Sequence, residues 1–374
     1  MRIGLITGEY PPLQGGIGNH VDILSRQLHA QGHQVYIFST RNTQQQTPEI
    51  PLTHTLSRWN WQTFSAVNRW VDHYQLDVVD FHFQTAAFDM SPWIHFLPAR
   101  VAIPFVATFH DLRFPYLFPK AGSLRDWIVM HMARTSDGVI TTNYEDALRL
   151  KDLRHAVIPL ASSIRITNLN DSAHWRARLD LPDKCFLLAY FGFINHSKGV
   201  DTLLKALALL DDPGITLLMI GERTGTADRT NVSYAKRIDR LIEDLGIAHQ
   251  LIWTGYVDEV TVSSYLQIVD AIILPFRDGA SFRRGTLMAA IEHECAVITT
   301  QPRLSVTEFE SGGLILVPPD DQQGLADAIS ELKHKPDLRA SLRQQVAELR
   351  DYFNWETVTA QVSAFYRRVI EETA

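Results

Sequence analysis

Cysteine is nearly absent from this chain of 374 residues, which contains only Cys185 and Cys295. Both lie inside apolar stretches, and their spacing fits neither a set of metal ligands nor a framework of disulfides. A fold held together by disulfides, as in small secreted domains, is therefore excluded, and a reducing compartment is expected.

Long hydrophobic runs are missing as well. No segment approaches the about 18 consecutive apolar residues of a membrane-spanning helix. The N-terminal MRIGLITGEY has one arginine and a short apolar run before Gly8 and Glu9, which is typical of a buried first strand and not of a signal peptide. We therefore expect a cytoplasmic protein, with peripheral contact at the inner face of a membrane left open.

A large excess of one charge is also missing. The chain has 35 Lys and Arg against 42 Asp and Glu, for a net charge of −7. This balance gives no overall attraction to nucleic acid, and no nucleic-acid partner is expected. Hydrophobic residues make up 45% and charged residues 21%, an ordinary globular composition, and the length allows about two or three domains.

Short apolar runs typical of strands alternate with helical periodicity along nearly the whole chain. In the first half, the expected strands are 3–7, 34–39, 78–83, 105–109, 138–142 and 156–160. After a polar stretch, a second series is expected at 186–191, 216–220, 251–254, 271–274, 296–300 and 314–317. The helices expected between and after the strands are 17–28, 200–210, 235–244, 286–293, 323–332 and the tail 336–374. The sequence thus predicts an α/β protein of two doubly wound, parallel-sheet domains, with a ligand in the cleft between them.

The stretch GEYPPLQGGIGNHV, from Gly8 to Val21, follows the first expected strand and precedes a helix. Such glycine-rich turns allow backbone N–H groups to approach a phosphate closely. A dinucleotide fingerprint would need G-x-G-x-x-G directly after the strand and an acidic residue about twenty positions later. Here Gly15, Gly16 and Gly18 come only after EYPPLQ, and the second expected strand ends in Ser-Thr. The spacing disfavours a dinucleotide site, and a plain tight turn is the alternative.

Motifs in a fixed order give the chain a family resemblance. They are GEYPP, GGIGNHV, TFHD, SDGVITTN, VIPLA, YFGFINHSKGVDTLLKA, LLMIG, WTGYVDE, DAIILPF, AVITT and GGLILVPPDD. Together they cover nearly the whole sequence and resemble the retaining family-4 glycosyltransferases (glycosyltransferase group 1). That family has the GT-B architecture of two facing Rossmann-like domains. The resemblance implies a nucleotide-diphosphate-sugar donor and an acceptor that is a glycan, a lipid-linked molecule or a small molecule.

The same resemblance implies a division of the chain. Residues 1–165 would form the acceptor-binding domain and residues 166–350 the donor-binding domain. The segment FNWETV resembles the family's crossover to the last helix, so residues 351–374 would pack back on the N-terminal domain. Nothing in the sequence indicates the oligomeric state.

The resemblance also implies which groups hold the donor diphosphate. Lys198 in NHSKG matches the family's diphosphate-binding lysine, with Gly192 and Asn195 in the same segment. Gly15 and Gly16 match the loop that faces the diphosphate from the other domain. A solvated loop lysine is the alternative interpretation of Lys198.

The chain departs from the family pattern at two places. The family has an arginine directly after the glycine of this segment, where the chain has Phe193. The family also carries E-x7-E before the strand at AVITT. Counting back from Val297 places Ser281 and Ala289 at those two positions. Neither Glu292 nor Glu294 lies at a matching position.

DGASFRRGTLMAAIEHE stands where the acids are expected. In it, Arg283 and Arg284 immediately precede Gly285 and Thr286, at the start of an expected helix whose free amides favour a phosphate. We infer that the arginine pair restores the missing cation. The alternative is a pair of solvated loop arginines that interact with Asp278.

Further candidates lie at the ends of strands in the N-terminal half. His110 in TFHD matches the family's histidine beside the reacting sugar, where a neutral imidazole could bind a donor hydroxyl; a structural role is the alternative. The acceptor-side candidates are Asp111, His82 at the end of another strand, and Glu9 and Asn19 beside the glycine-rich turn.

Family precedent implies retention of anomeric configuration, with the leaving phosphate taking the acceptor proton. This agrees with the lack of an evident glycosidase-type pair of carboxylates. No D-x-D motif lies in a suitable place, so no cofactor and no essential metal are expected. Residues 112–134 mix aromatic and basic side chains, which suits an acceptor pocket, a membrane contact or a helix packed into the core.

Three classes of function remain open at this stage. An active transferase with a modified donor site is favoured, because Lys198, His110 and the glycine-rich turn are present. A non-catalytic relative that binds nucleotides or acts as a scaffold comes second. A GT-B epimerase or phosphorylase comes third.

Overall fold

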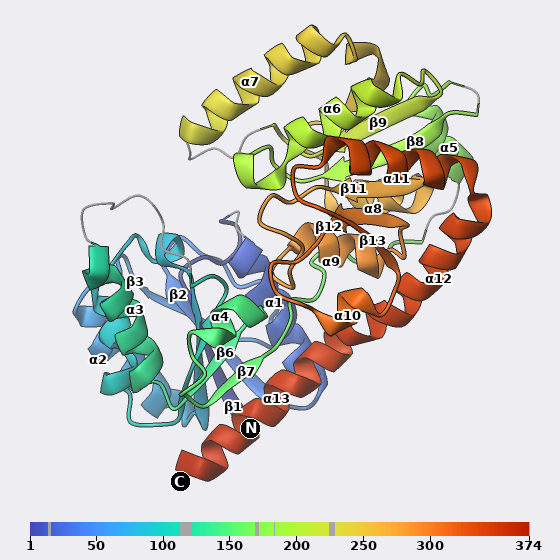
Figure 1. Cartoon of the computed structure of the whole chain (residues 1–374). Helices are drawn as coiled ribbons and strands as arrows, with labels where there is room; N and C mark the ends of the chain where they lie inside the picture. The colour runs from blue at the N-terminus through green and yellow to red at the C-terminus, as the bar shows by residue number, and fades with distance from the viewer. Residues whose placement is uncertain (14–15, 113–121, 169–171, 183, 224–228, 374) are drawn as a thin grey trace. The chain divides into compact units, whose positions relative to one another are not determined.

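The computed structural model describes residues 1–13, 16–112, 122–168, 172–182, 184–223 and 229–373. The chain divides into two compact units (Figure 1). Unit 1 is Met1–Ser163 with Trp355–Ala374, and unit 2 is Ile164–Asn354. Each unit is an α/β structure built on a parallel sheet.

Within the described residues, the sheet of unit 1 has seven strands, all paired in parallel. Their order across the sheet is β3 (Leu52–Leu56), β2 (Gln34–Thr40), β1 (Arg2–Thr7), β4 (Val78–Phe83), β5 (Phe105–Phe109), β6 (Gly138–Thr141) and β7 (His155–Val157). The strand order reverses direction between β1 and β4. In sheets of this kind ligands bind at the carboxyl ends of the strands beside such a point.

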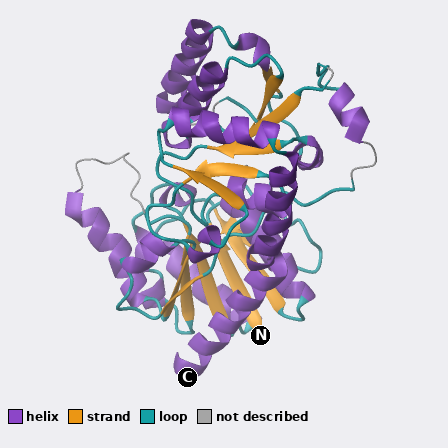
Figure 2. Ribbon diagram, turned by 45° about the vertical axis from the view of Figure 1, so that its right-hand side comes forward, coloured by secondary structure: helices purple, strands orange, loops and turns teal. Residues whose placement is uncertain are grey.

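Hydrophobic cores cover both faces of this sheet. Consecutive strand residues join opposite cores, as Val78 and Val79 do, because side chains alternate across a strand. One core includes α1 (Gly16–Ala30) and α13 (Trp355–Thr373), and the other includes α2 (Gln62–Tyr74) and α3 (Gly122–Thr135). Figure 2 shows the strands lying between these helices. The continuous apolar strands in the sequence therefore predicted a sheet covered on both faces correctly.

Strand β3 was not predicted from the sequence. Its residues LTHTL are mostly exposed or half-buried, so they show neither a continuous apolar run nor a clear alternation. The strand lies at the edge of the sheet and is held by parallel pairing with β2. Backbone hydrogen bonds to a neighbouring strand, and not local hydrophobicity, give this segment its structure.

The sheet of unit 2 has six parallel strands within the described residues. Their order is β10 (Leu251–Trp253), β9 (Ile215–Ile220), β8 (Phe186–Phe191), β11 (Ala271–Leu274), β12 (Val297–Thr300) and β13 (Leu314–Val317). The helices that accompany them are α5 (Ser172–Ala177), α6 (Val200–Leu210), α7 (Arg229–Leu245), α8 (Glu259–Ile268), α9 (Gly285–Glu292), α10 (Thr307–Glu310), α11 (Gln322–His334) and α12 (Pro336–Phe353). Here the order reverses between β8 and β11, so the expected ligand edge lies where the loops after β8 and β11 meet.

The predicted helical tail consists of two helices separated at Asn354, whose backbone is extended. The first, α12, belongs to unit 2, and the second, α13, belongs to unit 1. The indole N–H of Trp355 at the start of α13 donates to the carbonyl oxygen of Ser162 at 2.7 Å. Farther along, the hydroxyl of Tyr366 donates to Asp80 on β4.

The segment 112–134 is described only in part, since 113–121 lie outside the described residues. In α3, Met132 is buried in the core, whereas Trp127 is half exposed and stacks on His131 with ring centres 5.4 Å apart. The core interpretation therefore holds for Met132, and the acceptor-pocket and membrane interpretations remain predictions.

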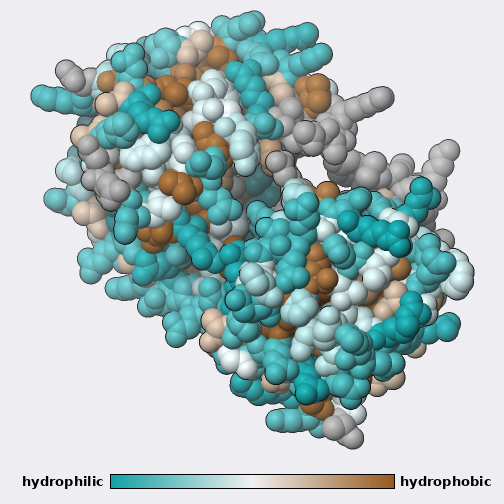
Figure 3. Space-filling model, turned by 180° about the vertical axis from the view of Figure 1, so that it is seen from behind, coloured by the Kyte–Doolittle hydropathy of each residue, from teal (hydrophilic) through white to brown (hydrophobic). Residues whose placement is uncertain are grey.

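None of the helices in the described parts combines the length and apolar character that crossing a bilayer requires. Hydrophilic residues predominate on the face shown in Figure 3.

Candidate active site

In unit 2, Lys198 ends a short 3₁₀ helix, His196–Lys198, in the loop after β8. The side-chain oxygen of Asn195 caps this helix: it accepts hydrogen bonds from the backbone N–H of Lys198 at 3.2 Å and from the hydroxyl of Ser197 at 2.8 Å. The predicted donor-site residues Asn195 and Lys198 therefore belong to one ordered turn, in which Asn195 shapes the backbone that carries the lysine.

Gly199 packs this turn tightly against the loop after β11. Its backbone is left-handed, with a φ of 67°, and a Cβ atom on it would lie 2.0 Å from the carbonyl oxygen of Pro275. A glycine is therefore needed here for both backbone freedom and space. The close approach fixes where Lys198 stands relative to β11.

Replacing Gly199 by alanine is expected to destabilise the protein by about 2 kcal/mol or more, because strain and a backbone clash act together. The midpoint of thermal unfolding should fall by several degrees. Gly246→Ala is the matched control, since Gly246 has a φ of 69° but nothing within 4 Å of an added Cβ. Equal stability of the two variants would show that the contact with Pro275 does not constrain the loop.

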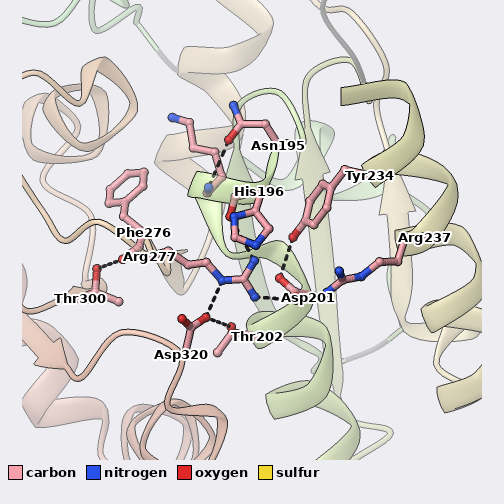
Figure 4. A network of polar contacts seen from close by, with 11 residues as sticks. Asn195, His196, Asp201, Thr202, Tyr234, Arg237, Phe276, Arg277, Thr300 and Asp320 are labelled. Carbon is pink, nitrogen blue, oxygen red and sulfur yellow. Dashed lines mark hydrogen bonds and ion pairs between the residues drawn. The ribbon is translucent and has the colours of Figure 1, made fainter. Parts of the chain in front are cut away.

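A network of polar contacts around Arg277 and Asp201 holds the same turn in place (Figure 4). The guanidinium of Arg277 donates to Asp201 at 2.6 Å, to Asp320 at 2.6 Å and to the carbonyl oxygen of His196 at 3.2 Å. Tyr234 donates to Asp201 at 2.6 Å. Burial alone would raise the pKa of Asp201, but the hydrogen bonds from Tyr234 and Arg277 lower it overall. Arg237 also pairs with Asp201 at 3.2 Å, so two arginines balance two aspartates in a network that joins the loops after β8, β11 and β13.

Sequence reasoning missed this network. Asp201 and Asp320 lie within the motifs used for the resemblance, and Arg277 directly follows one of them, but the contacts of Arg277 with Asp320 and Asp201 join residues 43 and 76 positions apart. Their spacing in the sequence carries no signal for that contact. The network is a positioning device for the turn that carries Lys198.

Basic side chains gather beside this turn. The Lys198 ammonium lies 5.0 Å from the centre of the Phe276 ring, and the Arg284 guanidinium carbon lies 4.6 Å from the same ring. Both contacts are of the cation–π type. The pKa of Lys198 is lowered to about 7, mainly by burial and also by Arg284 and Arg283, while Asp278 opposes the change. A half-buried lysine next to two arginines indicates a site that an anion would stabilise.

The arginine pair is neither solvated nor isolated. Arg283 donates to Asp278 at 2.9 Å, and Arg284 pairs with the other oxygen of the same carboxylate. The two arginine side chains are only 9% and 11% exposed. The alternative of solvated arginines is thus wrong as to exposure, although the pairing with Asp278 that it included is present. Lys198 adds a third cationic group close to this carboxylate.

The remaining predicted donor residues lie at the same place. Thr286, in the first turn of α9, has a buried hydroxyl with no hydrogen-bond partner among the described residues. A Cβ on Gly192 would lie 3.3 Å from the Thr286 methyl and 4.0 Å from the Lys198 ammonium. Gly285 begins α9, whose N-terminus has no side-chain cap. A cation cluster, an open backbone and an uncapped helix N-terminus together suit a phosphate.

The positions that depart from the family pattern are also described. At the position of the family's arginine the chain has Phe193, whose side chain is 52% exposed. Ser281 is half-buried in the loop before α9, and Ala289 is fully buried within α9.

In unit 1, His82 at the end of β4 and His110 after β5 lie side by side, as expected from neighbouring parallel strands. Nδ1 of His82 lies 3.2 Å from Nε2 of His110, within hydrogen-bond distance. His20 on α1 completes the group, with its ring centre 5.1 Å from that of His110 and 5.7 Å from that of His82. Sequence reasoning missed His20, although it stands in the GGIGNHV motif.

The three imidazoles are neutral. Burial lowers the pKa of His20 and of His82 to about 3, with His82 adding to the effect on His20. Burial and the two neighbouring rings hold the pKa of His110 well below its ordinary value. A neutral imidazole can donate a hydrogen bond from one nitrogen and accept one at the other, and so can hold a hydroxyl group.

Asp80 lies beneath His82. Its carboxylate accepts hydrogen bonds from Thr108 at 2.8 Å and from Tyr366, and lies 3.4 Å from Nε2 of His82. Burial raises the pKa of Asp80 to about 7, and these hydrogen bonds oppose the rise. A cavity of about 10 Å³ borders Asp80, His20 and His82, which is the space of roughly one water molecule.

The other predicted residues of unit 1 surround the glycine-rich turn or follow His110. Glu9 is half-buried, and burial raises its pKa; Asp111 is half-buried, and Asn19 is exposed on α1. Gly15 lies outside the described residues. Gly16 begins α1 with nothing within 4 Å of an added Cβ, so packing does not explain its lack of a side chain.

Gly18 differs from Gly16. A Cβ on Gly18 would lie 3.0 Å from the carbonyl oxygen of Glu9, so this glycine allows the helix to approach the turn. The tight-turn interpretation therefore accounts for Gly18 and not for Gly16.

Comparisons with known proteins cover most of the chain. Residues 14–159 match the model of Glycosyltransferase Family 4, and residues 171–349 match that of Glycosyl transferases group 1. Phosphatidyl-myo-inositol mannosyltransferase of Mycolicibacterium smegmatis is 24% identical, over 99% of this chain and 94% of that protein. Glycogen synthase of Mycobacterium tuberculosis is 25% identical, over 98% and 94%.

Solved structures share the fold. Sucrose-phosphate synthase from Thermosynechococcus elongatus superposes with a TM-score of 0.79 at 20% identity, covering 100% of both chains. The HepE protein of Anabaena in complex with UDP-glucose gives a TM-score of 0.73 at 16% identity, covering 98% of this chain and 100% of that one.

Proposed function

Because the chain belongs to the family-4, group 1 glycosyltransferases, we propose that it moves a sugar from a nucleoside diphosphate sugar to an acceptor, with retention of anomeric configuration. The observation that supports this donor is the cluster of Lys198, Arg283 and Arg284 around the carboxylate of Asp278. As the glycosidic bond breaks, negative charge develops on the departing diphosphate. Fixed cations and helix N–H groups stabilise that charge in the transition state.

The similar proteins indicate which donors and acceptors to test first. A complex of the HepE protein with UDP-glucose makes uridine diphosphate sugars the first donors to test. Among the relatives, the mannosyltransferase of Mycolicibacterium smegmatis and a D-inositol 3-phosphate glycosyltransferase of Acidothermus cellulolyticus are named for inositol-containing compounds. Inositol-containing acceptors are therefore the first of the glycan, lipid-linked and small-molecule classes to test.

Retention without a protein nucleophile agrees with the environment of Asp80. This carboxylate lies beneath His82 and is engaged by Thr108 and Tyr366, so it is not free to attack an anomeric carbon. The leaving phosphate would instead accept the proton of the attacking acceptor hydroxyl. In this mechanism His110 binds a hydroxyl of the transferred sugar.

Thermal-shift measurements with nucleotides and nucleotide sugars test the proposal, followed by assays of donor hydrolysis and transfer. A ligand at about 100 times its dissociation constant should stabilise the protein by about 2.7 kcal/mol. Stabilisation by diphosphates together with turnover of one donor is the expected result. No shift with any nucleotide would contradict the proposal, and binding without turnover of any donor would favour a nucleotide-binding relative.

Replacing Arg284 or Arg283 by alanine is expected to weaken binding of a nucleoside diphosphate by about 10- to 100-fold, because each loses a hydrogen bond between charged groups. Binding of the nucleoside without phosphates should stay unchanged. Calorimetry with both ligands measures the difference. Arg240→Ala, which removes an exposed arginine on α7, is the control. Equal losses for diphosphate and nucleoside would rule out a phosphate contact for the arginine pair.

A further inference from the structure

The three histidines of unit 1 form an arrangement that a hydrogen bond alone does not explain. The ring centres are separated by 5.1 Å, 5.4 Å and 5.7 Å, so the three rings are nearly equidistant. One nitrogen from each of His20, His82 and His110 lies within 4.8 Å of the other two. Among the described residues, a hydrogen bond between these rings joins His82 to His110, and His20 takes no part in it.

The spacing is close to that of a metal site with three histidines. Metal–nitrogen bonds of about 2.0–2.1 Å in a tetrahedral site place ligand nitrogens about 3.3 Å apart and ring centres about 5 Å apart. Nδ1 of His82 and Nε2 of His110 are 3.2 Å apart. A metal ion could therefore replace the proton shared by these nitrogens if each ring rotated modestly towards it. A modest shift of His20, which is half-buried, would complete the site.

The chemistry of the surroundings also suits a metal. Neutral imidazole is the form that binds metals, through the lone pair of one ring nitrogen. Behind His82, the carboxylate of Asp80 lies 3.4 Å from Nε2. A carboxylate behind a ligating histidine fixes the ring orientation and increases its basicity.

A small cavity lies beside two of the histidines. It has a volume of about 10 Å³, the space of roughly one water molecule, and it borders His20 and His82, whereas His110 is not among its lining residues. A site with three protein ligands keeps its fourth position for water or substrate. The side chains of Asp80 and Thr108 also line the cavity, so a water there would have polar partners.

We propose that His20, His82 and His110 form a binding site for one divalent transition-metal ion of the zinc type, with water as the fourth ligand. Imidazole ligands suit zinc, copper, nickel and cobalt better than magnesium or calcium. Since the metal occupies Nε2 of His110, its binding blocks that nitrogen. The bound metal should therefore inhibit sugar transfer. This expected inhibition rests on the proposed function, whereas the metal site itself does not.

Titration of the metal-free protein with Co²⁺ tests the site directly, because tetrahedral Co²⁺ has strong d–d absorption bands. One Co²⁺ per chain should bind with these bands, and Zn²⁺ should displace it. His20→Asn and His82→Asn should each abolish the bands. Asp80→Asn should lower the Co²⁺ affinity by about 10- to 100-fold through the loss of the supporting carboxylate.

His33→Asn is the matched control. His33 is a buried histidine of the same unit, but it directly precedes β2 and so lies at the amino end of a strand, whereas His82 and His110 lie at carboxyl ends. It should bind Co²⁺ like the wild type. Circular dichroism and thermal unfolding establish that each variant is folded. Absence of tetrahedral bands in the wild type would overturn the proposal, as would unchanged bands in the folded His20→Asn variant.

Transfer assays give an independent measurement. Micromolar Zn²⁺ should inhibit transfer, and a chelator should restore full activity. A protein that shows the Co²⁺ bands but no transfer would retain the metal site and contradict the proposed function. Sugar transfer without Co²⁺ bands would support the proposed function and overturn the metal site.

Discussion

Replacing Lys198 by methionine is expected to lower kcat for sugar transfer by about 10²- to 10³-fold, the loss typical of one group that stabilises a developing anion. Methionine keeps an apolar chain against Phe276, so the local packing should survive. The ammonium lies in a cluster where Arg284 shares the same aromatic ring. Removing it leaves the two arginines paired with Asp278 as the remaining cations. Steady-state kinetics measures the effect, and Lys205→Met, on the exposed side of α6, is the control.

The same lysine predicts a pH dependence of nucleotide binding. Burial lowers the pKa of Lys198 to about 7 in the free protein, and a bound diphosphate would raise it by opposite charge. The affinity contributed by the charged lysine is therefore fully present below about pH 7 and is lost as pH rises towards the pKa of the complex. At pH 8, binding should take up a proton, since the terminal phosphate is already ionised.

Calorimetry of diphosphate binding at pH 8, in buffers with different ionisation enthalpies, counts this proton. The wild type should take up a proton and Lys198→Met should not. Equal uptake by the two proteins would show that another group titrates. A kcat within threefold of the wild-type value for Lys198→Met would contradict the role in transfer.

The sequence predicted the parts of this protein that depend on local patterns. Continuous apolar strands, such as Phe186–Phe191 and Ala271–Leu274, can be recognised because a sheet covered on both faces needs apolar residues at every position. Strand β3 could not, because an edge strand has little buried side chain and depends on its neighbour. The donor-site residues Asn195 and Lys198 were predicted from the family resemblance of one short segment, NHSKG, and the structure shows that local hydrogen bonds order this segment.

Contacts between distant parts of the chain could not be predicted in this way. Tyr366 and Asp80 are 286 positions apart, and Arg277 and Asp201 are 76 apart. No periodicity links such residues, since their pairing depends on the assembled fold. His20 is an intermediate case: its helix was predicted, but the direction of its ring towards His110 depends on packing against the sheet.

Replacing His110 by alanine is expected to lower kcat by about 10²- to 10⁴-fold, the range for a positioned imidazole in the transition state. Affinity for a nucleoside diphosphate should remain within about threefold of the wild type, because the groups proposed to bind the diphosphate belong to unit 2. The variant thus separates transfer from nucleotide binding. Activity within threefold of wild type, or a parallel loss of nucleotide affinity, would contradict this role.

The pH profile supplies a second test of His110. Because burial and the neighbouring rings hold its pKa well below the ordinary value, His110 remains neutral as the pH falls from 8 to 6. A histidine with an ordinary pKa would become protonated over that range. No loss of kcat assignable to histidine protonation is therefore expected there. His82→Asn removes the hydrogen bond at 3.2 Å and one of the two rings that depress this pKa, while burial and His20 remain, so it should lower kcat and move the acid limb of the profile to higher pH. A folded His82→Asn protein with an unchanged kcat and profile would show that the two rings act independently.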